Sequence, residues 1–279
     1  MPTIRPFQRA DRDQLTALVN AHVAAVVPGA SISVNALMSQ LEREPAELIV
    51  DPWVIERRTI VAIERDAIVA GAHVLCYGDD DKVGESYRGL RIIRCLVARP
   101  DAMPAAVELL ASLDVDAADG TLPAPFVYGV PNVWPHIRTL YVQAGFVPSR
   151  TEVVLVAEIP DLPDAPFTAE RSVGPWTWTR LAAGDAYIDL ETDLTAGGTL
   201  SRFVGWADIG NLVAADDVTR VWLLAQAKHW LRLGGVTRLV AYADADGDSF
   251  YLANGFRELV RTERGWARAR GDRPTSRGR

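Results

Sequence analysis

The chain has 279 residues, of which 49% are hydrophobic and 23% charged, and its formal net charge is −7. These values are typical of a globular protein of a little under two domains, and they exclude disordered and fibrous classes. The negative charge argues against nucleic acid as the main partner. The sequence contains no membrane-length apolar run and does not begin with a secretory signal, so we expect a cytoplasmic protein without membrane contact.

Metal and disulfide chemistry are not indicated either. The two cysteines, Cys76 and Cys95, lie in no Cys/His cluster. The four histidines are scattered, and none has a partner at ligand spacing, so we expect no metal site.

The first half of the chain alternates between the two secondary-structure periods. Apolar spacing predicts a strand at 3–7, helices at 10–27 and 33–44, strands at 59–64, 68–75 and 90–97, a helix at 104–117, a strand at 126–128, a helix from about 132 to 144, and a strand at 151–159. Arg65-Asp66 predicts a tight turn between two of the strands, and Ser33 predicts an N-cap. This order describes one α/β domain, residues 1–159.

A Pro-rich linker, residues 160–175, precedes the second half. There the pattern predicts strands at 176–181, 187–193 and 200–214, a helix at 218–233, a strand at 236–243, a short helix at 249–254 and a last strand at 256–267. We therefore expect a second domain at 176–267 and a basic, flexible tail at 268–279.

A short motif occurs once in each half. Tyr141-Val-Gln-Ala-Gly-Phe146 and Tyr251-Leu-Ala-Asn-Gly-Phe256 both follow a strand–helix–strand unit. Together with the opening Thr3–Leu15 and the segment Trp230–Leu239, these motifs make the sequence similar to the GCN5-related N-acetyltransferase (GNAT) superfamily in its tandem form. The resemblance implies two α/β domains with mixed sheets, the second without the first two helices of the family.

The resemblance also implies a function and a set of residues. Family members transfer an acyl group from acetyl-CoA, wedged where the fourth and fifth strands part, to an amine. Tyr251, and less directly Tyr141, match the tyrosine that protonates the departing thiolate, although each can instead pack beside the following phenylalanine. Asp208 lies where a carboxylate can take the proton of the amine, and its alternative is a local hydrogen bond at a strand edge.

The cofactor loop departs from the family pattern. The resemblance places cofactor contacts at Leu212, Val213, Ala214 and Arg220, but the segment has no glycine and carries Asp216 and Asp217 where a diphosphate would lie. The corresponding segment of the first half, 97–105, also has no glycine and contains Pro104. Acetyl-CoA is therefore expected only with a remodelled loop.

Carboxylates and tryptophans in the second half suggest where a substrate binds. Glu191 and Asp193, with Asp189, share one strand face and suit a cationic amine, although a solvated face explains them equally well. Trp178 and Trp206 can line a pocket or belong to the core.

We therefore expect a monomeric or homodimeric acyltransferase for a small amine. The alternatives are a cofactor-free protein that binds or transforms a small molecule in the same cleft, and a non-catalytic scaffold.

Overall fold

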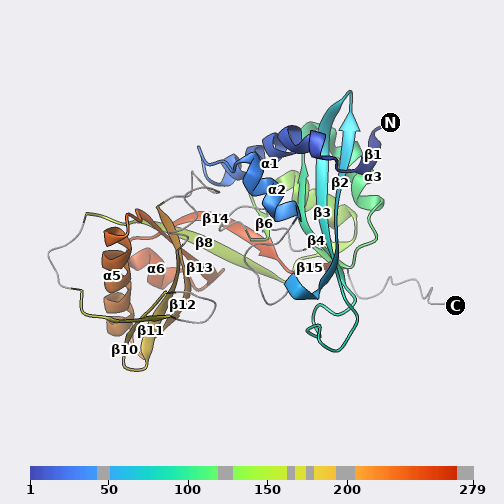
Figure 1. Ribbon diagram of the computed structural model, residues 1–279. Helices are drawn as coiled ribbons and strands as arrows, with labels where there is room; N and C mark the ends of the chain where they lie inside the picture. Colours follow the sequence, from blue (N-terminus) through green and yellow to red (C-terminus); the bar gives the residue numbers. More distant parts are fainter. Residues whose placement is uncertain (43–50, 119–127, 162–166, 174–178, 193–204, 269–279) are drawn as a thin grey trace. The chain divides into compact units, whose positions relative to one another are not determined.

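The structure, a computed structural model, describes residues 1–42, 51–118, 128–161, 167–173, 179–192 and 205–268 (Figure 1). The chain divides into two compact units. Unit 1 consists of Met1–Thr151 and Thr262–Arg279, and unit 2 of Glu152–Arg261. Within the described part of the chain, no helix has both the length and the apolar character needed to cross a membrane.

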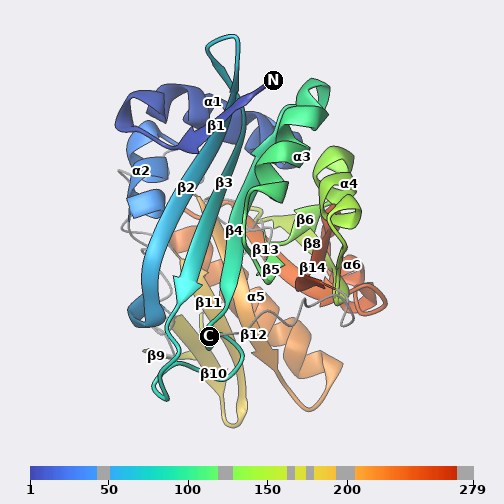
Figure 2. The same cartoon turned by 90° about the vertical axis from the view of Figure 1, so that its right-hand side faces the viewer.

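Unit 1 is a mixed sheet with helices on both faces. Its helices are η1 (Arg9–Asp11), α1 (Arg12–Val26), α2 (Val34–Glu42), η2 (Asp51–Trp53), η3 (Pro100–Ala102), α3 (Met103–Ala111) and α4 (Pro135–Gln143). Its strands are β1 (Thr3–Pro6), β2 (Val54–Glu64), β3 (Ala67–Tyr77), β4 (Arg91–Ala98), β5 (Ala117–Ala118), β6 (Val130–Pro131), β7 (Phe146–Val147) and β15 (Trp266–Arg268). One sheet has the order β1-β2-β3-β4-β5-β15-β7. Helices α1 and α2 lie on one face, and α3 and α4 on the other (Figure 2).

Local signals explain most of these elements. Arg65 and Asp66 both have positive φ, of 50° and 63°, which makes the tight β2–β3 turn that the sequence predicts. The Ser33 hydroxyl accepts the Ala36 N–H at 3.1 Å, so Ser33 caps α2 as predicted.

The helix predicted at 104–117 is shorter, because it ends at Ala111. The Asp116 carboxylate instead accepts the Arg91 N–H at 3.0 Å, and Asp116 donates its own N–H to the Arg91 carbonyl at 2.9 Å. Asp116 therefore pairs with the first residue of β4 instead of extending the helix, and β5 begins at the next residue. Of the strand predicted at 126–128, residues 126 and 127 lie outside the described residues, and Tyr128 is not in a strand.

Unit 2 has a second mixed sheet. Its elements are β9 (Glu170–Val173), β10 (Thr179–Ala183), β11 (Ala186–Thr192), β12 (Trp206–Val213), α5 (Asp217–Leu233), β13 (Arg238–Asp244) and α6 (Ser249–Ala253), with most of β8 (Arg150–Glu158) and β14 (Arg257–Arg264). The sheet order is β6-β14-β8-β13-β12-β11-β10-β9. Among the described residues of unit 2, no helix precedes α5, as the sequence predicts.

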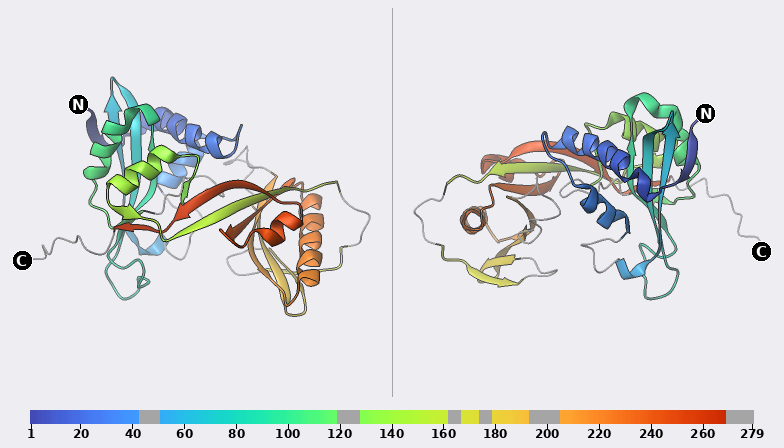
Figure 3. Two further views of the ribbon diagram at one scale, coloured as in Figure 1. Left: turned by 180° about the vertical axis from the view of Figure 1, so that it is seen from behind. Right: turned by 45° about the horizontal axis from the view of Figure 1, so that its top comes forward.

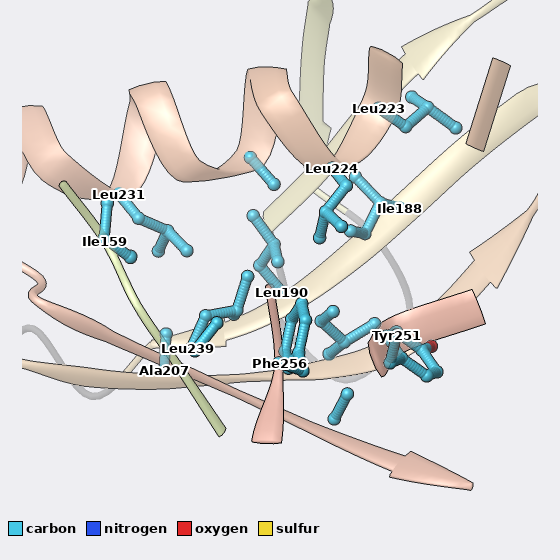
Figure 4. Packing of buried hydrophobic residues seen from close by; sticks show 14 of the residues in the cluster. Ile159, Ile188, Leu190, Ala207, Leu223, Leu224, Leu231, Leu239, Tyr251 and Phe256 are labelled. Carbon is cyan, nitrogen blue, oxygen red and sulfur yellow. The ribbon is translucent and has the colours of Figure 1, made fainter. Parts of the chain in front are cut away.

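The core of unit 2 lies between α5 and one face of its sheet. Leu223, Leu224 and Leu231 of α5 pack on Leu190 of β11 and Leu239 of β13 (Figure 4). Because side chains alternate along a strand, the residues between these positions face away from α5. That second face carries the candidate site.

The two units do not coincide with the two halves of the sequence. Residues 152–158 of β8 belong to unit 2, where Glu158 to Glu152 pair antiparallel with Arg238 to Asp244 of β13. Strand β15 belongs to unit 1, where Trp266 pairs with Ala118 and Ala267 pairs with Val147. Figure 3 shows β8 beside β14, its neighbour in the sheet order. The seven-stranded sheet therefore contains β15 from the second half of the chain, and the eight-stranded sheet contains β6 and β8 from the first half. The last predicted strand, 256–267, is broken at Gly265, where φ is +62°.

Candidate active site

Strands β12 and β13 of unit 2 are parallel neighbours for only a short distance. Trp206, Ala207 and Asp208 pair with Arg238, Leu239 and Val240. Strand β12 then continues to Val213 and β13 to Asp244, both beyond the ladder. The two strands therefore part at Asp208.

A β-bulge follows directly. Asp189 of β11 pairs with Asn211, but the next residue, Leu190, pairs with Ile209, so Gly210 is the extra residue. A bulge bends its strand and changes where the side chains around it point. Here it places Asn211 on the same face as Asp189, whose Oδ2 accepts the Asn211 Nδ2–H at 3.0 Å.

Asp189 is already neutralised by the protein. It is 0% exposed, and its two oxygens accept hydrogen bonds from the Arg180 guanidinium at 2.7 and 2.8 Å. Burial opposes its ionisation, but the hydrogen bonds from Arg180 and Asn211 outweigh burial and hold the pKa of Asp189 below its ordinary value. Asp189 therefore orders the strands and has little capacity left for a substrate.

Asp208 has a different environment, although it is also buried. The Tyr242 hydroxyl donates to its Oδ2 at 3.0 Å, and Glu191 lies directly opposite it on β11. Burial, followed by the negative charge of Glu191, raises the pKa of Asp208 to about 7, while the bond from Tyr242 works in the opposite direction. A carboxyl group with this pKa takes up and releases protons near neutral pH.

Trp206 lies on the same strand face as Asp208, two residues earlier. It is 9% exposed, and the Arg238 guanidinium lies 5.0 Å from its ring centre. The structure thus brings together Asp208, Glu191 and Trp206 of the residues predicted from sequence. Asp193 and Trp178 lie outside the described residues.

Tyr251 comes from the opposite side of the sheet. It belongs to the cluster under α5 and packs edge-to-face on Phe256, with ring centres 5.2 Å apart, at the α6 end of the cluster (Figure 4). Burial raises the pKa of Tyr251, although the charge of Arg220 opposes this. The phenol is therefore protonated at neutral pH and able to donate a proton.

Unit 1 has the same bulge but different chemistry. His73 of β3 pairs with Cys95 and Val74 pairs with Ile93, so Arg94 is the extra residue. Two positions before this bulge stands Ile92, opposite Leu75. These two apolar residues take the places of Asp208 and Glu191, so unit 1 lacks the carboxylate pair. Tyr141, at 0% exposure, packs against Phe146 and Trp266, with ring centres 5.7 and 5.4 Å away.

The predicted cofactor contacts lie around the start of α5. Leu212 and Ala214 pack on the core, whereas Val213 is exposed. Arg220 lies in the first turn, as predicted, where it donates to the Asp217 Oδ1 at 3.1 Å and its guanidinium carbon lies 3.9 Å from the Phe250 ring centre.

The residues at this helix start do not fit the diphosphate of acetyl-CoA. The Asp216 carboxylate already accepts the Thr219 N–H at 2.7 Å and the Thr219 hydroxyl at 3.1 Å. It therefore occupies the place where a helix N-terminus would hold a phosphate. These hydrogen bonds from Thr219 hold the pKa of Asp216 below its ordinary value, so the position is negatively charged.

Sequence reasoning missed two relationships. Tyr242 is separated from Asp208 by 34 residues, and only the β12–β13 register brings them together. The second is a histidine pair, because the Nε2 atoms of His22 and His136 lie 3.1 Å apart. The chain separation of this pair is 114 residues, so no local spacing reveals it.

Comparison with known proteins gives the fold. No family model and no curated protein matches the sequence. A GCN5-related glucosamine N-acetyltransferase region of a fungal multi-domain β-N-acetylglucosaminidase is 13% identical with a TM-score of 0.62; the match covers 95% of this chain but only 38% of that one. A GCN5-related N-acetyltransferase from Sphaerobacter thermophilus is 12% identical over 95% of both chains, with a TM-score of 0.60. A tandem GNAT protein from the clavulanic acid biosynthesis pathway is 12% identical, with a TM-score of 0.61, over 98% of this chain and 100% of that one.

Proposed function

Because the chain has the tandem fold of the GCN5-related N-acetyltransferases, we propose that unit 2 transfers an acyl group to a small amine. The observation that carries the proposal is the position of Asp208. It lies where β12 and β13 part, and its pKa of about 7 suits a general base at neutral pH. The fold by itself supports only the reaction class.

The acceptor arrives as an ammonium ion, which the negative charges of Glu191 and Asp208 favour. Asp208 takes one proton from it, and the neutral nitrogen then attacks the acyl carbonyl carbon. A C–N bond forms, and the bond between the acyl carbon and its leaving group breaks. Tyr251 is the group proposed to protonate the leaving group, since its phenol is neutral.

The oxyanion of the intermediate is stabilised by backbone N–H groups of β12 beyond Asp208. The parallel ladder ends there, and the bulge at Gly210 turns the backbone out of regular pairing. Fixed backbone donors are effective at such positions because they do not reorganise during the reaction.

Unit 1 is proposed to be non-catalytic. Its bulge is preserved, but Ile92 and Leu75 replace the acidic pair, and neither can accept a proton. Its role in this proposal is structural.

The donor implied by the fold is acetyl-CoA, which would supply an activated acyl thioester. The start of α5 does not accommodate its diphosphate. We therefore propose acyl transfer without assigning acetyl-CoA as the donor. The same mismatch favours a second candidate, a cofactor-free protein that binds a small amine at Asp208 without acylating it.

A product assay separates the two candidates. The protein is incubated with a mixture of primary amines and acyl thioesters, and amide products are identified by mass spectrometry. Acyl transfer predicts an amide that the Asp208→Asn variant forms at least 100-fold more slowly, within the range expected for a general base. Binding of an amine without any amide product supports the cofactor-free candidate instead.

A further inference from the structure

The Asp216 carboxylate lies at the start of α5 and caps the helix. The helix has 17 residues, and its first turn offers backbone N–H groups and the positive end of the helix dipole. The Asp216 carboxylate accepts the Thr219 N–H at 2.7 Å and the Thr219 hydroxyl at 3.1 Å. A phosphate at this position has to displace Asp216 or remain beside it.

A second negative charge follows in the same turn. Asp217 is exposed, and its Oδ1 accepts a hydrogen bond from the Arg220 guanidinium at 3.1 Å. The same guanidinium also lies over the ring of Phe250. Asp216, Asp217 and Arg220 together give this turn a net negative charge, which repels a diphosphate.

Unit 1 offers no replacement at the equivalent helix start. Arg99 donates to both carboxylate oxygens of Asp101 at 3.0 and 2.6 Å. Pro100 and Pro104, which stand in the first turns of η3 and α3, have no N–H to donate.

The stretch of β12 beyond Asp208 suits an uncharged chain that carries amide groups. Beyond the Asp208–Val240 pair, the backbone of β12 is no longer paired with β13. The edge of an extended strand binds chains that carry amide groups. Leu212 and Ala214, at the end of β12, are half-buried apolar residues of the same core.

We propose that the acyl donor of unit 2 is a thioester without a diphosphate, of the pantetheine type, and that Asp216 excludes the diphosphate of CoA from the start of α5. This inference rests on the proposed acyl transfer. The amine nitrogen bonds to the acyl carbon and the C–S bond breaks. The ammonium nitrogen loses two protons in all: one passes to Asp208, and the other balances the proton that the thiolate takes up when it is released as the thiol.

Binding measurements test the inference without turnover. Calorimetry compares pantetheine with CoA on the wild-type protein and on Asp216→Ser. Serine caps a helix as well as aspartate does but carries no charge, so the helix start is preserved. We expect wild type to bind pantetheine at least as tightly as CoA. In Asp216→Ser, CoA affinity should rise at least tenfold while pantetheine affinity stays within threefold.

Asp217→Ser is the matched control, because it removes one negative charge from the same turn but leaves the Asp216 carboxylate bound to the Thr219 N–H. It should raise CoA affinity less than threefold. The inference is overturned if wild type binds CoA tenfold tighter than pantetheine, if pantetheine does not bind at millimolar concentration, or if Asp216→Ser gives no increase for CoA.

Turnover then separates this inference from the proposed function. If pantetheine binds as expected but S-acetylpantetheine and acetyl-CoA both leave every amine unmodified, acyl transfer fails and the exclusion of the diphosphate stands. If acetyl-CoA is used with a kcat/KM at least tenfold above that of S-acetylpantetheine, acyl transfer stands and the exclusion fails.

Discussion

Glu191 and Asp208 lie directly opposite each other on β11 and β12, so two carboxyl groups share one stretch of strand surface. The charge of Glu191 is one of the two causes that raise the pKa of Asp208 to about 7. Glu191 therefore adjusts the proton affinity of Asp208 without needing to touch a substrate.

Replacing Glu191 with glutamine removes this charge and lowers the pKa of Asp208. More of the base is then ionised in mild acid, so kcat/KM at pH 6 should rise about two- to fivefold relative to its plateau. This range corresponds to an interaction of up to about 1 kcal/mol, because Glu191 is the exposed member of the pair. The pH profile of kcat/KM measures the change. Asp185→Asn, in the exposed β10–β11 turn, is the control and should leave the profile in place.

Tyr242→Phe should move the profile in the opposite direction. The Tyr242 hydroxyl donates to the charged form of Asp208, so its loss raises the pKa of that carboxyl. At pH 6 we expect kcat/KM to fall about tenfold relative to the plateau, since a hydrogen bond to a charged group contributes roughly 1.5–3 kcal/mol. A shift in the same direction as Glu191→Gln would contradict the assignment of Tyr242 to Asp208.

The two motif tyrosines should differ in their effect on activity. Tyr251→Phe removes the proposed proton donor, and we expect kcat to fall at least tenfold. Tyr141→Phe removes the same atom from the fully buried tyrosine of unit 1 and should leave kcat within twofold. Thermal denaturation of both variants controls for stability, and a larger kcat loss in Tyr141→Phe would place the chemistry in unit 1.

His73 should make unit 1 sensitive to acid. Burial, together with the charges of Arg57 and Arg94, lowers the pKa of His73 to about 4, compared with 6.5 in an unfolded chain. As the pH falls below 6.5 the unfolded chain takes up the proton first, so stability is complete above pH 6.5 and decreases between pH 6.5 and 4. The expected loss for this one histidine at pH 5 is about 2 kcal/mol.

His73→Asn should remove that part of the pH dependence. Urea unfolding at pH 7.5 and pH 5 gives the difference for wild type and variant, and comparing the two differences cancels other groups such as Asp208. An unchanged difference would mean that His73 is protonated in the folded protein.

Trp266→Ala should destabilise unit 1 although residue 266 follows the whole of unit 2 in the sequence. The side chain is 0% exposed and contacts Tyr141, and its removal should cost about 3–5 kcal/mol. Amide hydrogen exchange should speed up in β4 and β7. The half-buried Trp230 of α5 provides the control, because Trp230→Ala should speed up exchange in β12 and β13 instead.

The order of elements could be predicted from local pattern, because helical spacing, Ser33 and the Arg65-Asp66 turn all act over a few residues. The position of Asp208 near the parting strands was implied by the resemblance to the acetyltransferase superfamily, which places such a carboxylate on the strand before the central helix. Tyr242 could not be predicted, because it depends on the register between two strands separated by α5. The salt bridge of Asp189 with Arg180 could not be predicted either, because it depends on the register between β10 and β11. In the sequence, Asp189 is only one of several acidic residues.

The strand exchange was equally inaccessible to sequence reasoning. Strand β15 has three residues, and its neighbours β5 and β7 have two each, so no periodicity marks them as partners. Only their assembled register shows that Trp266 completes a sheet begun at Thr3.

This exchange has a consequence for the order of folding during synthesis. A nascent chain that has emerged as far as Val147 holds most of unit 1 but lacks β15, and the apolar surface that Trp266 later covers stays open while the ribosome makes the whole of unit 2. Contacts between residues so distant in sequence form slowly, because a long loop must close first. The protein should therefore complete unit 1 only after translation of its last strand. Gene fragments cut between β8 and β9, inside unit 2, should then give two insoluble products that become soluble when they are expressed together.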